Sequence, residues 1–507
     1  MATPASNPAS QAEPDLIGAS GGAVAAAPVE PTPAGAGMTS GAEVPPGPAS
    51  EADPDHPLRE IFRVAAPSVA TMTSYTAMQF IDALMVARID PTDDVYLSAQ
   101  GNGGLAAWIP MSICAGLVSV VNTYVAQNLG AGSPARGSAY GWNGIWIAAF
   151  VAILMFPYAL ALPALFAWAG HAPRLIDLEV SYANILIAGA FVSMSTRAIS
   201  QYFYGMHRPN IVLIAAVAGN LVNILFNWIL IYGNLGAPAL GVVGAAIATL
   251  IGSGVELAIP MCVFLGPTFN RDFGTRAAWP ISFHHLRDIW KIGWPGALTF
   301  GNEMICWGYF VLVLVASFGE HHNTATWVVH RYMHLSFMPA VGISFAMTAI
   351  IGRYLGMGRP DLAAQRARLG IALSAGYMGL CGLAFVLFRG PMTSVFSSDP
   401  AVIDIALNLL LIAALFQLFD GLGITIIGIL RGAGDTVWPG VVTVALSWLL
   451  LAGGGHLASR LFPEWGSLGP WAGAAAYIIA LGLYLLVRFT RGKWKTMKLV
   501  ERPGVNH

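Results

Sequence analysis

Charged residues are scarce in this chain. Only 10% of its 507 residues are Asp, Glu, Lys or Arg, whereas soluble domains contain roughly 25%. The formal net charge is −1, so the basic excess that marks nucleic-acid-binding proteins is missing. Neither a water-soluble multidomain protein nor a partner of nucleic acid is therefore expected.

Cysteines and catalytic motifs are also scarce. The four cysteines (Cys114, Cys262, Cys306 and Cys381) lie inside apolar runs with no paired spacing. We expect them to be buried packing residues, forming neither disulfides nor a metal site. The motifs HExxH and GxSxG and a Walker-type phosphate loop do not occur in the sequence. An enzyme and an ATP-driven pump are therefore not expected.

Basic residues are missing from the amino-terminal segment, residues 1–56, and the first one in the chain is Arg59. This segment is rich in Ala, Pro and Gly, a composition that predicts disorder. It has neither the basic start nor the apolar core of a secretory signal peptide, so none is expected.

Long apolar runs dominate the remaining sequence, and 56% of all residues are hydrophobic. A helix of about 20 apolar residues crosses the ~30 Å hydrocarbon core of a bilayer. Backbone groups in lipid must be satisfied internally, so these runs are predicted to be helices. The sequence thus predicts an all-α integral membrane protein with twelve spans near residues 64–86, 105–126, 144–168, 182–203, 211–232, 242–265, 292–318, 325–351, 369–387, 403–430, 437–458 and 471–487.

The basic residues predict the orientation of these spans. If the amino terminus is cytoplasmic, most Arg and Lys residues outside the spans are cytoplasmic too, including those of the linker 270–291 and the tail 491–507. Only Arg88, Arg174, Arg389 and Arg460 fall on the opposite side. This bias follows the positive-inside rule. Both termini are therefore predicted to be cytoplasmic, with the chain in the cell (inner) membrane.

The two halves of the chain resemble each other. Segment 129–134 (LGAGSP) is similar to 355–360 (LGMGRP), and Pro67 and Pro295 stand at matching places in the first and seventh spans. Each half holds six spans, an even number, so the copies run in the same direction. This pattern predicts two parallel six-helix bundles, 57–269 and 292–490, around a central cavity.

Motifs in both halves carry a family resemblance. The second span ends in VAQNLGAG, the fifth contains NILFNW, and the tenth ends in LRGAGDT. With these motifs in this order, the chain resembles the multidrug and toxic compound extrusion (MATE) family from about Pro57 to Arg491. Glu303 and Asp420 resemble the acidic pair of its bacterial cation-coupled branch. The resemblance implies a secondary transporter, acting as a monomer, that exports small cationic or amphipathic molecules by antiport with Na⁺ or H⁺ and needs no other cofactor.

Three acidic residues, Asp82, Glu303 and Asp420, are predicted to lie well inside spans. A charge at mid-membrane costs at least about 3 kcal/mol, so each needs a reason to be there. One hypothesis is that these residues bind the coupling cation or the positive charge of the substrate, with Glu303 and Asp420 as possible Na⁺ ligands. The alternative is that they only form hydrogen bonds between packed helices.

Asn223 and Asn227 are four residues apart and so share a helix face. With Asp82 they are predicted to form a second pocket of oxygen ligands, which suits a hard cation. Thr249 matches another ligand position of the family, whereas some relatives have an aspartate at the place of Asn227. The alternative for both asparagines is packing between helices.

Further candidates line the predicted cavity near the acidic pair. Phe416 stands where sodium-coupled relatives can have a tyrosine, and Gln417, one turn from Asp420, is a possible replacement ligand. Trp307 is one turn from Glu303 and is placed to stack on a flat cation, or else to anchor at the membrane interface.

The eighth predicted span contains His330, Arg331 and His334. One hypothesis is a proton relay through the two histidines. The other, which we favour, is that Arg331 neutralises Glu303 or Asp420 and the histidines bond to neighbouring helices.

The sequence is also compatible with other functions. A flippase for lipid-linked cargo is the main alternative, because related proteins share the two-bundle plan. Such flippases usually line the cavity with basic residues, whereas Arg197 and Arg331 are the only arginines inside the predicted spans. A channel or a membrane-embedded enzyme has less support.

Overall fold

The structure of the chain is a computed structural model that describes residues 56–90, 93, 95–497 and 499–500. These residues belong to one compact unit, Ala49–His507. The predicted disordered segment 1–56, except His56, and most of the tail after residue 497 lie outside the described residues.

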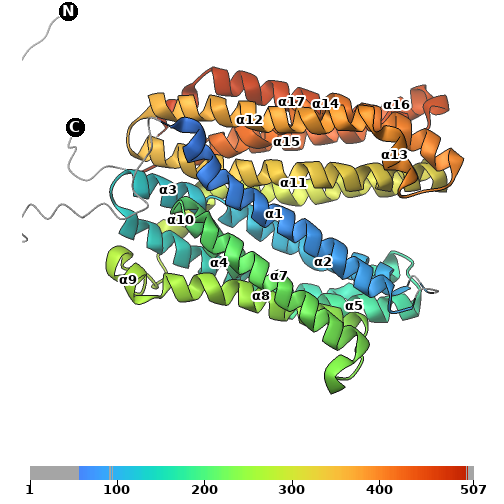
Figure 1. Cartoon of the computed structure of the whole chain (residues 1–507), viewed down its shortest axis with the longest axis horizontal. Coiled ribbons are helices and arrows are strands. Elements are labelled where there is room, and N and C mark those ends of the chain that lie inside the picture. The colour runs from blue at the N-terminus through green and yellow to red at the C-terminus, as the bar shows by residue number, and fades with distance from the viewer. Residues whose placement is uncertain (1–55, 91–92, 94, 498, 501–507) are drawn as a thin grey trace, which may run out of the picture. The chain divides into compact units, whose positions relative to one another are not determined.

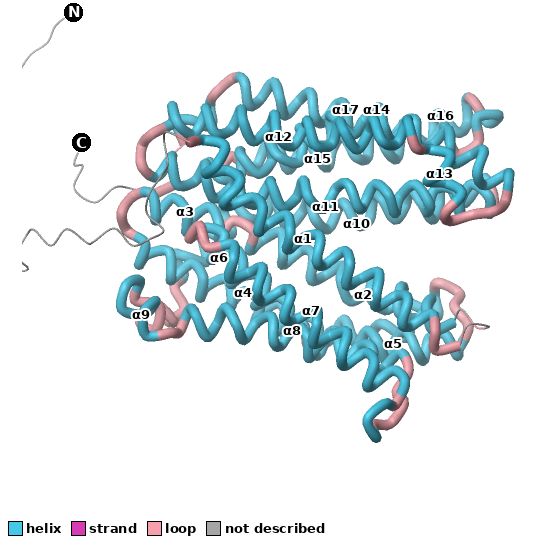
Figure 2. Tube along the Cα trace, in the orientation of Figure 1, coloured by secondary structure: helices cyan, strands magenta, loops and turns pink. Residues whose placement is uncertain are grey.

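The described chain is helical throughout, and no strand occurs in it (Figure 2). Short turns join most of the helices. The helices are α1 (Pro57–Ala87), α2 (Val95–Val118), α3 (Val121–Gly130), α4 (Pro134–Trp168), α5 (Pro173–Ala188), α6 (Ala190–Gly205), α7 (Pro209–Tyr232), α8 (Val242–Phe264), α9 (Pro267–Phe273), α10 (Phe283–Tyr309), α11 (Glu320–Gly356), α12 (Pro360–Leu387), α13 (Arg389–Ser394), α14 (Pro400–Ala433), α15 (Val437–Leu446), α16 (Gly455–Leu461) and α17 (Leu468–Thr490).

Ten helical segments of the described chain are long and apolar enough to cross a membrane. The pair α5–α6, bent by 49° at Gly189, makes an eleventh. Helix α1 has 31 residues and is long enough to span, but it is not among these segments. The ten segments, the bent pair and α1 together correspond to the twelve expected spans. The predicted all-helical membrane fold is therefore confirmed.

Several spans are less regular than predicted. The second breaks after Val118 and resumes as α3, and the polar stretch 270–291 contains the end of α9 and the first turns of α10. Two spans of the carboxyl-terminal half contain π-helical turns, Phe310–Val315 after α10 and Ser447–Gly454 after α15. Such turns are rare and often mark functional sites.

The first helix of each half packs against the other half. Helix α1 packs on α7 of its own half and also on α11, and α10 packs on α2 (Figure 1). Accordingly Ile61, Val64 and Ala65 of α1 lie in the apolar core of the carboxyl-terminal half. Conversely, Ile289 and Ile292 of α10 lie in the core of the amino-terminal half. The leading helix of each half thus packs against both halves and joins the two bundles.

Contacts between the halves gather at the end where α1 begins and α17 ends. Thr123 Oγ1 donates to the Arg431 carbonyl at 2.9 Å, and Gln127 Nε2 donates to the Gly432 carbonyl at 3.0 Å. The Leu499 backbone N–H donates to Gln127 Oε1 at 3.3 Å, so the chain after α17 returns to this end. The start of α1 and the end of the described chain therefore lie on the same side.

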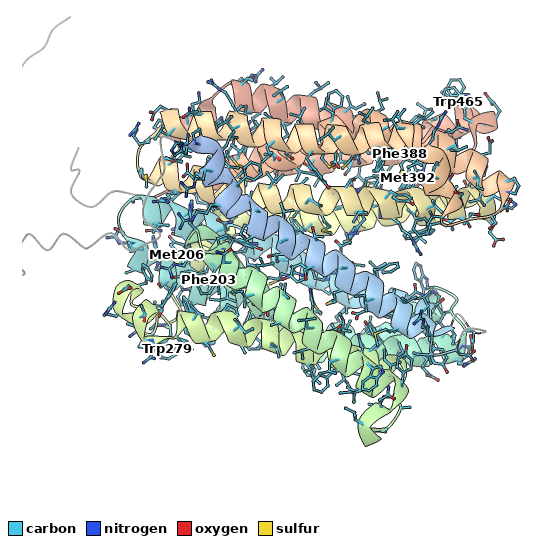
Figure 3. The ribbon with its side chains drawn as sticks, viewed as in Figure 1. Phe203, Met206, Trp279, Phe388, Met392 and Trp465 are labelled. Atoms are coloured by element: carbon cyan, nitrogen blue, oxygen red, sulfur yellow. The ribbon has the colours of Figure 1, made fainter. Side chains whose placement is uncertain are left out.

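Large aromatic side chains are exposed toward both ends of the helices. Trp279, between α9 and α10, and Trp465, after α16, lie toward opposite ends (Figure 3). Exposed tryptophans at both ends are typical of anchors at the two membrane–water interfaces. The cysteines are less uniform than expected: Cys114 and Cys306 are buried, but Cys262 is exposed.

Candidate cation and substrate sites

The first polar cluster joins α1, α7 and α8 inside the amino-terminal half. Asn227 Nδ2 donates to Asp82 Oδ1 at 2.5 Å and to Asn223 Oδ1 at 3.1 Å. Asn223 Nδ2 in turn donates to Thr249 Oγ1 at 3.3 Å. The four residues predicted from the sequence to share one pocket therefore form a continuous chain of hydrogen bonds.

One atom of this cluster has no partner. The Asn227 side chain is fully buried, and its carbonyl oxygen Oδ1 accepts no hydrogen bond from the described residues. A buried acceptor left unpaired is costly, and a bound cation is one way to satisfy it. Asp82 is also buried, with 7% of its surface exposed. The carboxylate of Asp82 and the amide oxygen of Asn227 are thus hard oxygen ligands held beside each other.

The second cluster joins α10, α14 and α17 in the carboxyl-terminal half. Glu303 and Asp420 lie close enough to repel each other electrostatically. Tyr477, which the sequence did not single out, donates its hydroxyl to Glu303 Oε1 at 3.3 Å. No hydrogen bond to Asp420 occurs among the described residues, so this carboxylate is available to a cation.

The turn of α10 that carries Glu303 is tied to the π-helical turn that follows α15. Asn302, the preceding residue, donates Nδ2 to Ser447 Oγ at 2.9 Å, and Trp448 Nε1 donates to Asn302 Oδ1 at 2.7 Å. Cys306 Sγ also reaches the Ser447 carbonyl at 3.5 Å. A change in the π-helical turn Ser447–Gly454 would therefore move the turn that carries Glu303.

Gln417, the predicted replacement ligand, forms a hydrogen bond with another helix. Its side chain is buried, and its Nε2 donates to Ser336 Oγ of α11 at 2.7 Å. Phe416 is fully buried in the apolar core of the carboxyl-terminal half. The structure therefore places both residues in helix packing, and among the described residues no hydrogen bond joins Gln417 to Asp420.

Trp307 lies in an aromatic group with the first histidine of α11. Its ring is 6.2 Å from the ring of His330 and 5.4 Å from that of Phe310. His330 also meets Trp327 edge-on at 5.7 Å, and His334 lies near enough to His330 to influence its charge. The two histidines are thus neighbours, as their spacing predicted.

The favoured hypothesis for Arg331 was wrong. Its guanidinium lies over the Phe396 ring, 5.3 Å from the centroid, and its side chain is exposed. Among the described residues no ion pair joins Arg331 to Glu303 or to Asp420. The reason is geometric, because the Arg331 side chain of α11 lies against Phe396 in the segment after α13.

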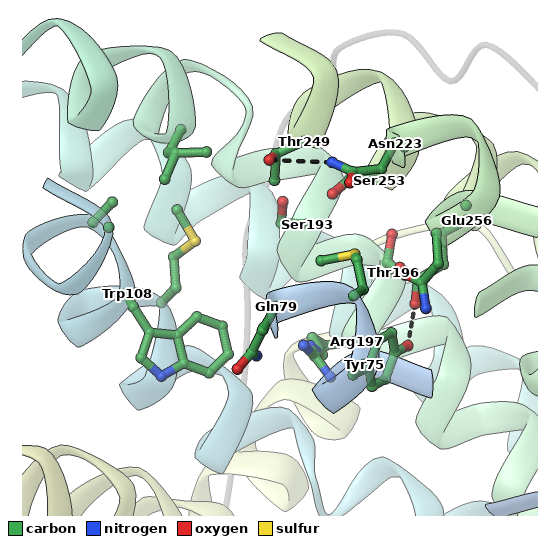
Figure 4. A pocket seen from close by; sticks show the side chains of 18 residues that line it. Tyr75, Gln79, Trp108, Ser193, Thr196, Arg197, Asn223, Thr249, Ser253 and Glu256 are labelled. Carbon is green, nitrogen blue, oxygen red and sulfur yellow. Dashed lines mark hydrogen bonds between the residues drawn. The ribbon is translucent and has the colours of Figure 1, made fainter. Parts of the chain in front are cut away.

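A cavity of about 220 Å³ opens inside the amino-terminal half (Figure 4). It extends from the Asp82 cluster, since Asn223 and Thr249 are part of its wall. Its polar lining continues with Gln79, Ser193, Thr196, Asn220 and Ser253, and its apolar lining includes Met78, Trp108, Met111 and Leu186. Apolar walls with a few convergent polar groups are typical of small-molecule sites.

The cavity contains two charged residues, Arg197 of α6 and Glu256 of α8. Glu256 accepts a hydrogen bond from the Tyr75 hydroxyl. The sequence placed Arg197 inside a predicted span but gave it no partner. Helical spacing alone cannot reveal that α1, α6 and α8 meet around one space.

Known protein families and individual proteins are similar to this chain. The family model described as MatE matches residues 67–229 and 299–452, one segment in each half. The protein named probable multidrug resistance protein NorM from Pseudomonas aeruginosa is 28% identical over 455 residues, which covers 88% of this chain and 91% of the relative. Multidrug resistance protein PmpM of the same organism is 28% identical over 463 residues, covering 88% of this chain and 94% of PmpM.

Solved structures share the fold. A multidrug resistance MATE family transporter of the MOP superfamily, solved in an outward-facing conformation, superposes with a TM-score of 0.76 at 21% identity and covers 86% of this chain and 97% of its own. The eukaryotic MATE transporter AtDTX14 gives a TM-score of 0.78 at 18% identity, covering 87% and 97%.

Proposed function

Because this chain belongs to the MatE family, we propose that it is a multidrug exporter that moves small cationic or amphipathic molecules out of the cell by antiport with Na⁺ or H⁺. Relatives across nearly the whole chain are named as multidrug resistance proteins, which supports the export of small molecules. We also propose that it sits in the inner membrane with both termini cytoplasmic, since the basic residues are concentrated at that end.

The observation that carries the coupling part of the proposal is the unpaired oxygen of Asn227 beside Asp82. A cation bound there would satisfy this acceptor and neutralise the carboxylate. A proton on Asp82 would remove the charge instead. Either event changes the charge of a cluster whose Asn223 and Thr249 also line the cavity. Occupation by the coupling ion and occupation by substrate are thus linked through shared residues.

Glu303 and Asp420 supply a second acidic site of similar chemistry. Two nearby carboxylates in a membrane interior favour binding of a proton or a cation, because each raises the cost of ionising the other. Tyr477 and the π-helical turns after α10 and α15 connect this site to helix packing. We propose that this pair binds the coupling ion in the carboxyl-terminal half.

The contacts between the halves at the end where α1 begins and α17 ends bear on the transport cycle. The hydrogen bonds from Thr123 and Gln127 to α14 hold the halves together at this end. We propose that this end faces the cytoplasm and is closed to it in this conformation. We propose that coupling-ion binding in this state releases substrate outward. The halves then separate at the terminal end to admit the next molecule from the cytoplasm.

The test is ethidium transport into inverted membrane vesicles, driven first by a pH gradient and then by a Na⁺ gradient. Wild type is compared with Asp82→Asn, Glu303→Gln and Asp420→Asn. We expect one gradient to drive transport in wild type and at least one of the three variants to lose it while remaining folded and inserted. The gradient that works identifies the ion, and the variant that fails identifies the coupling site.

Two outcomes would contradict the proposal. If all three variants show full gradient-driven transport, neither acidic site binds the coupling ion. If wild type transports ethidium under neither gradient, the cargo is of another class, and a flippase of lipid-linked or other amphipathic cargo becomes the next hypothesis to test.

A further inference from the structure

The chain after α17 is fastened to the carboxyl-terminal half by a buried tryptophan. Gly492, at a φ of +74°, turns the chain away from α17, and a single 3₁₀ turn, Lys493–Thr496, follows. Trp494 is 0% exposed and lies in the apolar core of the carboxyl-terminal half. Its Nε1 donates to the Phe489 carbonyl at 3.0 Å. Chain ends stay poorly ordered unless they are tied down, and Trp494 is the side chain that ties this one.

Shortly after Trp494 the tail reaches the other half. The Leu499 backbone N–H donates to Gln127 Oε1 at 3.3 Å, and Leu499 and Val500 pack against the apolar core of the amino-terminal half. The Leu499 side chain also lies over the end of α14, because a Cβ added at Gly434 would come within 2.6 Å of Leu499 Cδ1. The tail therefore contacts both halves at the place where they meet.

Gln127 of α3 is the centre of this junction. Its side-chain amide is used on both sides, since Nε2 donates to the Gly432 carbonyl of α14 and Oε1 accepts from Leu499. Gln127 is only 2% exposed. Removing the tail would take a donor from a buried acceptor, which is costly. The tail thus completes a hydrogen-bonded contact between the halves.

The corresponding segment of the amino-terminal half stays with its own half. Helices α8 and α17 are the sixth and twelfth spans, so the segments that follow them are equivalent in the repeat. After α8, helix α9 (Pro267–Phe273) places Phe269 in the apolar core of the amino-terminal half. The segment after α17 places Trp494 in its own core in the same way but then continues to the opposite half. The crossing is therefore an addition to the repeated plan.

From these contacts we propose that the described tail, residues 492–497 and 499–500, is a strap that stabilises closure of the two halves at this end. If the halves separate here, the tail strap cannot remain bound to both. Trp494 holds it in the carboxyl-terminal core, so the contacts of Leu499 with Gln127 and the amino-terminal core are the ones that break. This release step rests on the proposed function, in which the halves separate at this end.

The setting of the tail strap makes its release costly. Basic and exposed residues surround it, including Arg491, Lys493 and Lys495, which is typical of a membrane–water boundary. In water the burial of Leu499 and Val500 gains from the hydrophobic effect, whereas apolar contacts inside lipid gain nothing comparable. Opening this end would expose both side chains to water, so the tail strap shifts the population toward the closed state.

Closure is tested by the labelling rate of a cysteine at Thr123 in the purified full-length protein, after the four native cysteines are replaced by alanine. Thr123 is fully buried at this end, so its labelling reports separation of the halves. The test variant combines Leu499→Ser and Val500→Ser, which remove the apolar contacts of the tail. Thr496→Ala is the matched control, because Thr496 is exposed and its hydroxyl donates only within the tail, to the Lys493 carbonyl.

We expect labelling at residue 123 to become roughly tenfold faster in the double variant, as for the loss of buried leucine and valine contacts. Leu499→Ala, a smaller change, should give an intermediate rate, which separates loss of the contact from loss of the fold. Thr496→Ala should label like the parent. Equal rates in the parent, Leu499→Ala and the double variant would overturn the proposal.

Release is tested by a disulfide between the tail strap and the amino-terminal half. Gln127→Cys and Leu499→Cys are combined in the same cysteine-free background and oxidised with copper phenanthroline. We expect ethidium transport into inverted vesicles to stop on oxidation and to return with a reductant, while each single variant ignores oxidation. Undiminished transport by the cross-linked protein would overturn the release step. Failure of the export proposal is a different result, namely no ethidium transport by wild type under either gradient, and the labelling rates would still decide whether the tail strap stabilises closure.

Discussion

Glu60 and Arg366 form a buried ion pair between the two halves of the protein. Arg366 Nε donates to Glu60 Oε2 at 2.7 Å, and the two side chains are 0% and 7% exposed. Tyr354 of α11 donates its hydroxyl to the same carboxylate at 2.8 Å. Glu60 is in the first turn of α1, so the leading helix of one half is fastened to α11 and α12 of the other. This pair belongs to the same closed end as the contacts of Thr123 and Gln127.

Removing one partner of this pair should favour separation of the halves at the closed end. Arg366→Ala leaves the Glu60 carboxylate with a single donor in a buried place, and such a loss typically costs about 3–5 kcal/mol. We expect lower thermal stability in detergent and faster labelling of a cysteine introduced at Thr123. The control is Asp361→Asn, which breaks the exposed pair with Arg359 at the same end. Equal effects of the two variants would contradict a role for burial.

A methyl group at Gly356 should keep the same end from closing. A Cβ added there would clash with the backbone of Gln127 in the other half, and backbone cannot move aside cheaply. We expect Gly356→Ala to insert in the membrane but to stay open at this end, with transport strongly reduced. Gly376→Ala, in the middle of α12, meets nothing within 4 Å and should behave like wild type. Normal transport by Gly356→Ala would show that this close approach is dispensable.

His207 should make stability depend on pH. It lies between α6 and α7, and its Nε2 is 3.1 Å from the Ala349 carbonyl of α11, so this nitrogen carries the proton. Burial, and secondarily the charge of Arg353, lower the pKa of His207 from 6.5 to about 3. Between these values the unfolded chain binds a proton that the folded protein does not, so stability falls as the pH drops below about 6.5.

Thermal denaturation in detergent from neutral to acidic pH measures this effect. His207→Gln retains a donor for the Ala349 carbonyl without the titrating ring. The variant should show a smaller loss of melting temperature on acidification than wild type. The same pH dependence in both proteins would assign it to other groups.

Asn227 should control the cation affinity of the Asp82 cluster. Asn227→Leu removes the donor to Asp82 and to Asn223 as well as the unpaired oxygen, so binding of radiolabelled Na⁺ at this cluster and gradient-driven transport should both fall. Asn227→Asp adds a second carboxylate at the same place and should tighten Na⁺ binding by adding negative charge. Asn220→Leu is the control for Na⁺ binding, because Asn220 lies two turns before Asn227 on α7 and bonds to Ser74 instead. Unchanged Na⁺ binding in both Asn227 variants would place the cation elsewhere.

The spacing of polar residues predicted the Asp82 cluster well. Asn223 and Asn227 share a helix face at any helical geometry, and an acid inside a span needs polar neighbours. The same reasoning failed for Arg331, which lies over Phe396 and pairs with neither acid. Sequence spacing gives the face of one helix, whereas the partner depends on how that helix is rotated against others.

The sequence by itself determined that the chain forms about twelve membrane helices in two repeated halves, because apolar run length and backbone satisfaction in lipid leave no other structure. It also determined which polar residues lie at membrane depth. Only the tertiary structure decided that α1 and α10 each pack into the core of the opposite half, and that Glu60 pairs with Arg366. It also decided that Tyr75, Arg197 and Glu256 line the same cavity. Those contacts join helices far apart in sequence, and inside a membrane they are selected by close packing and hydrogen bonding, which no single helix encodes.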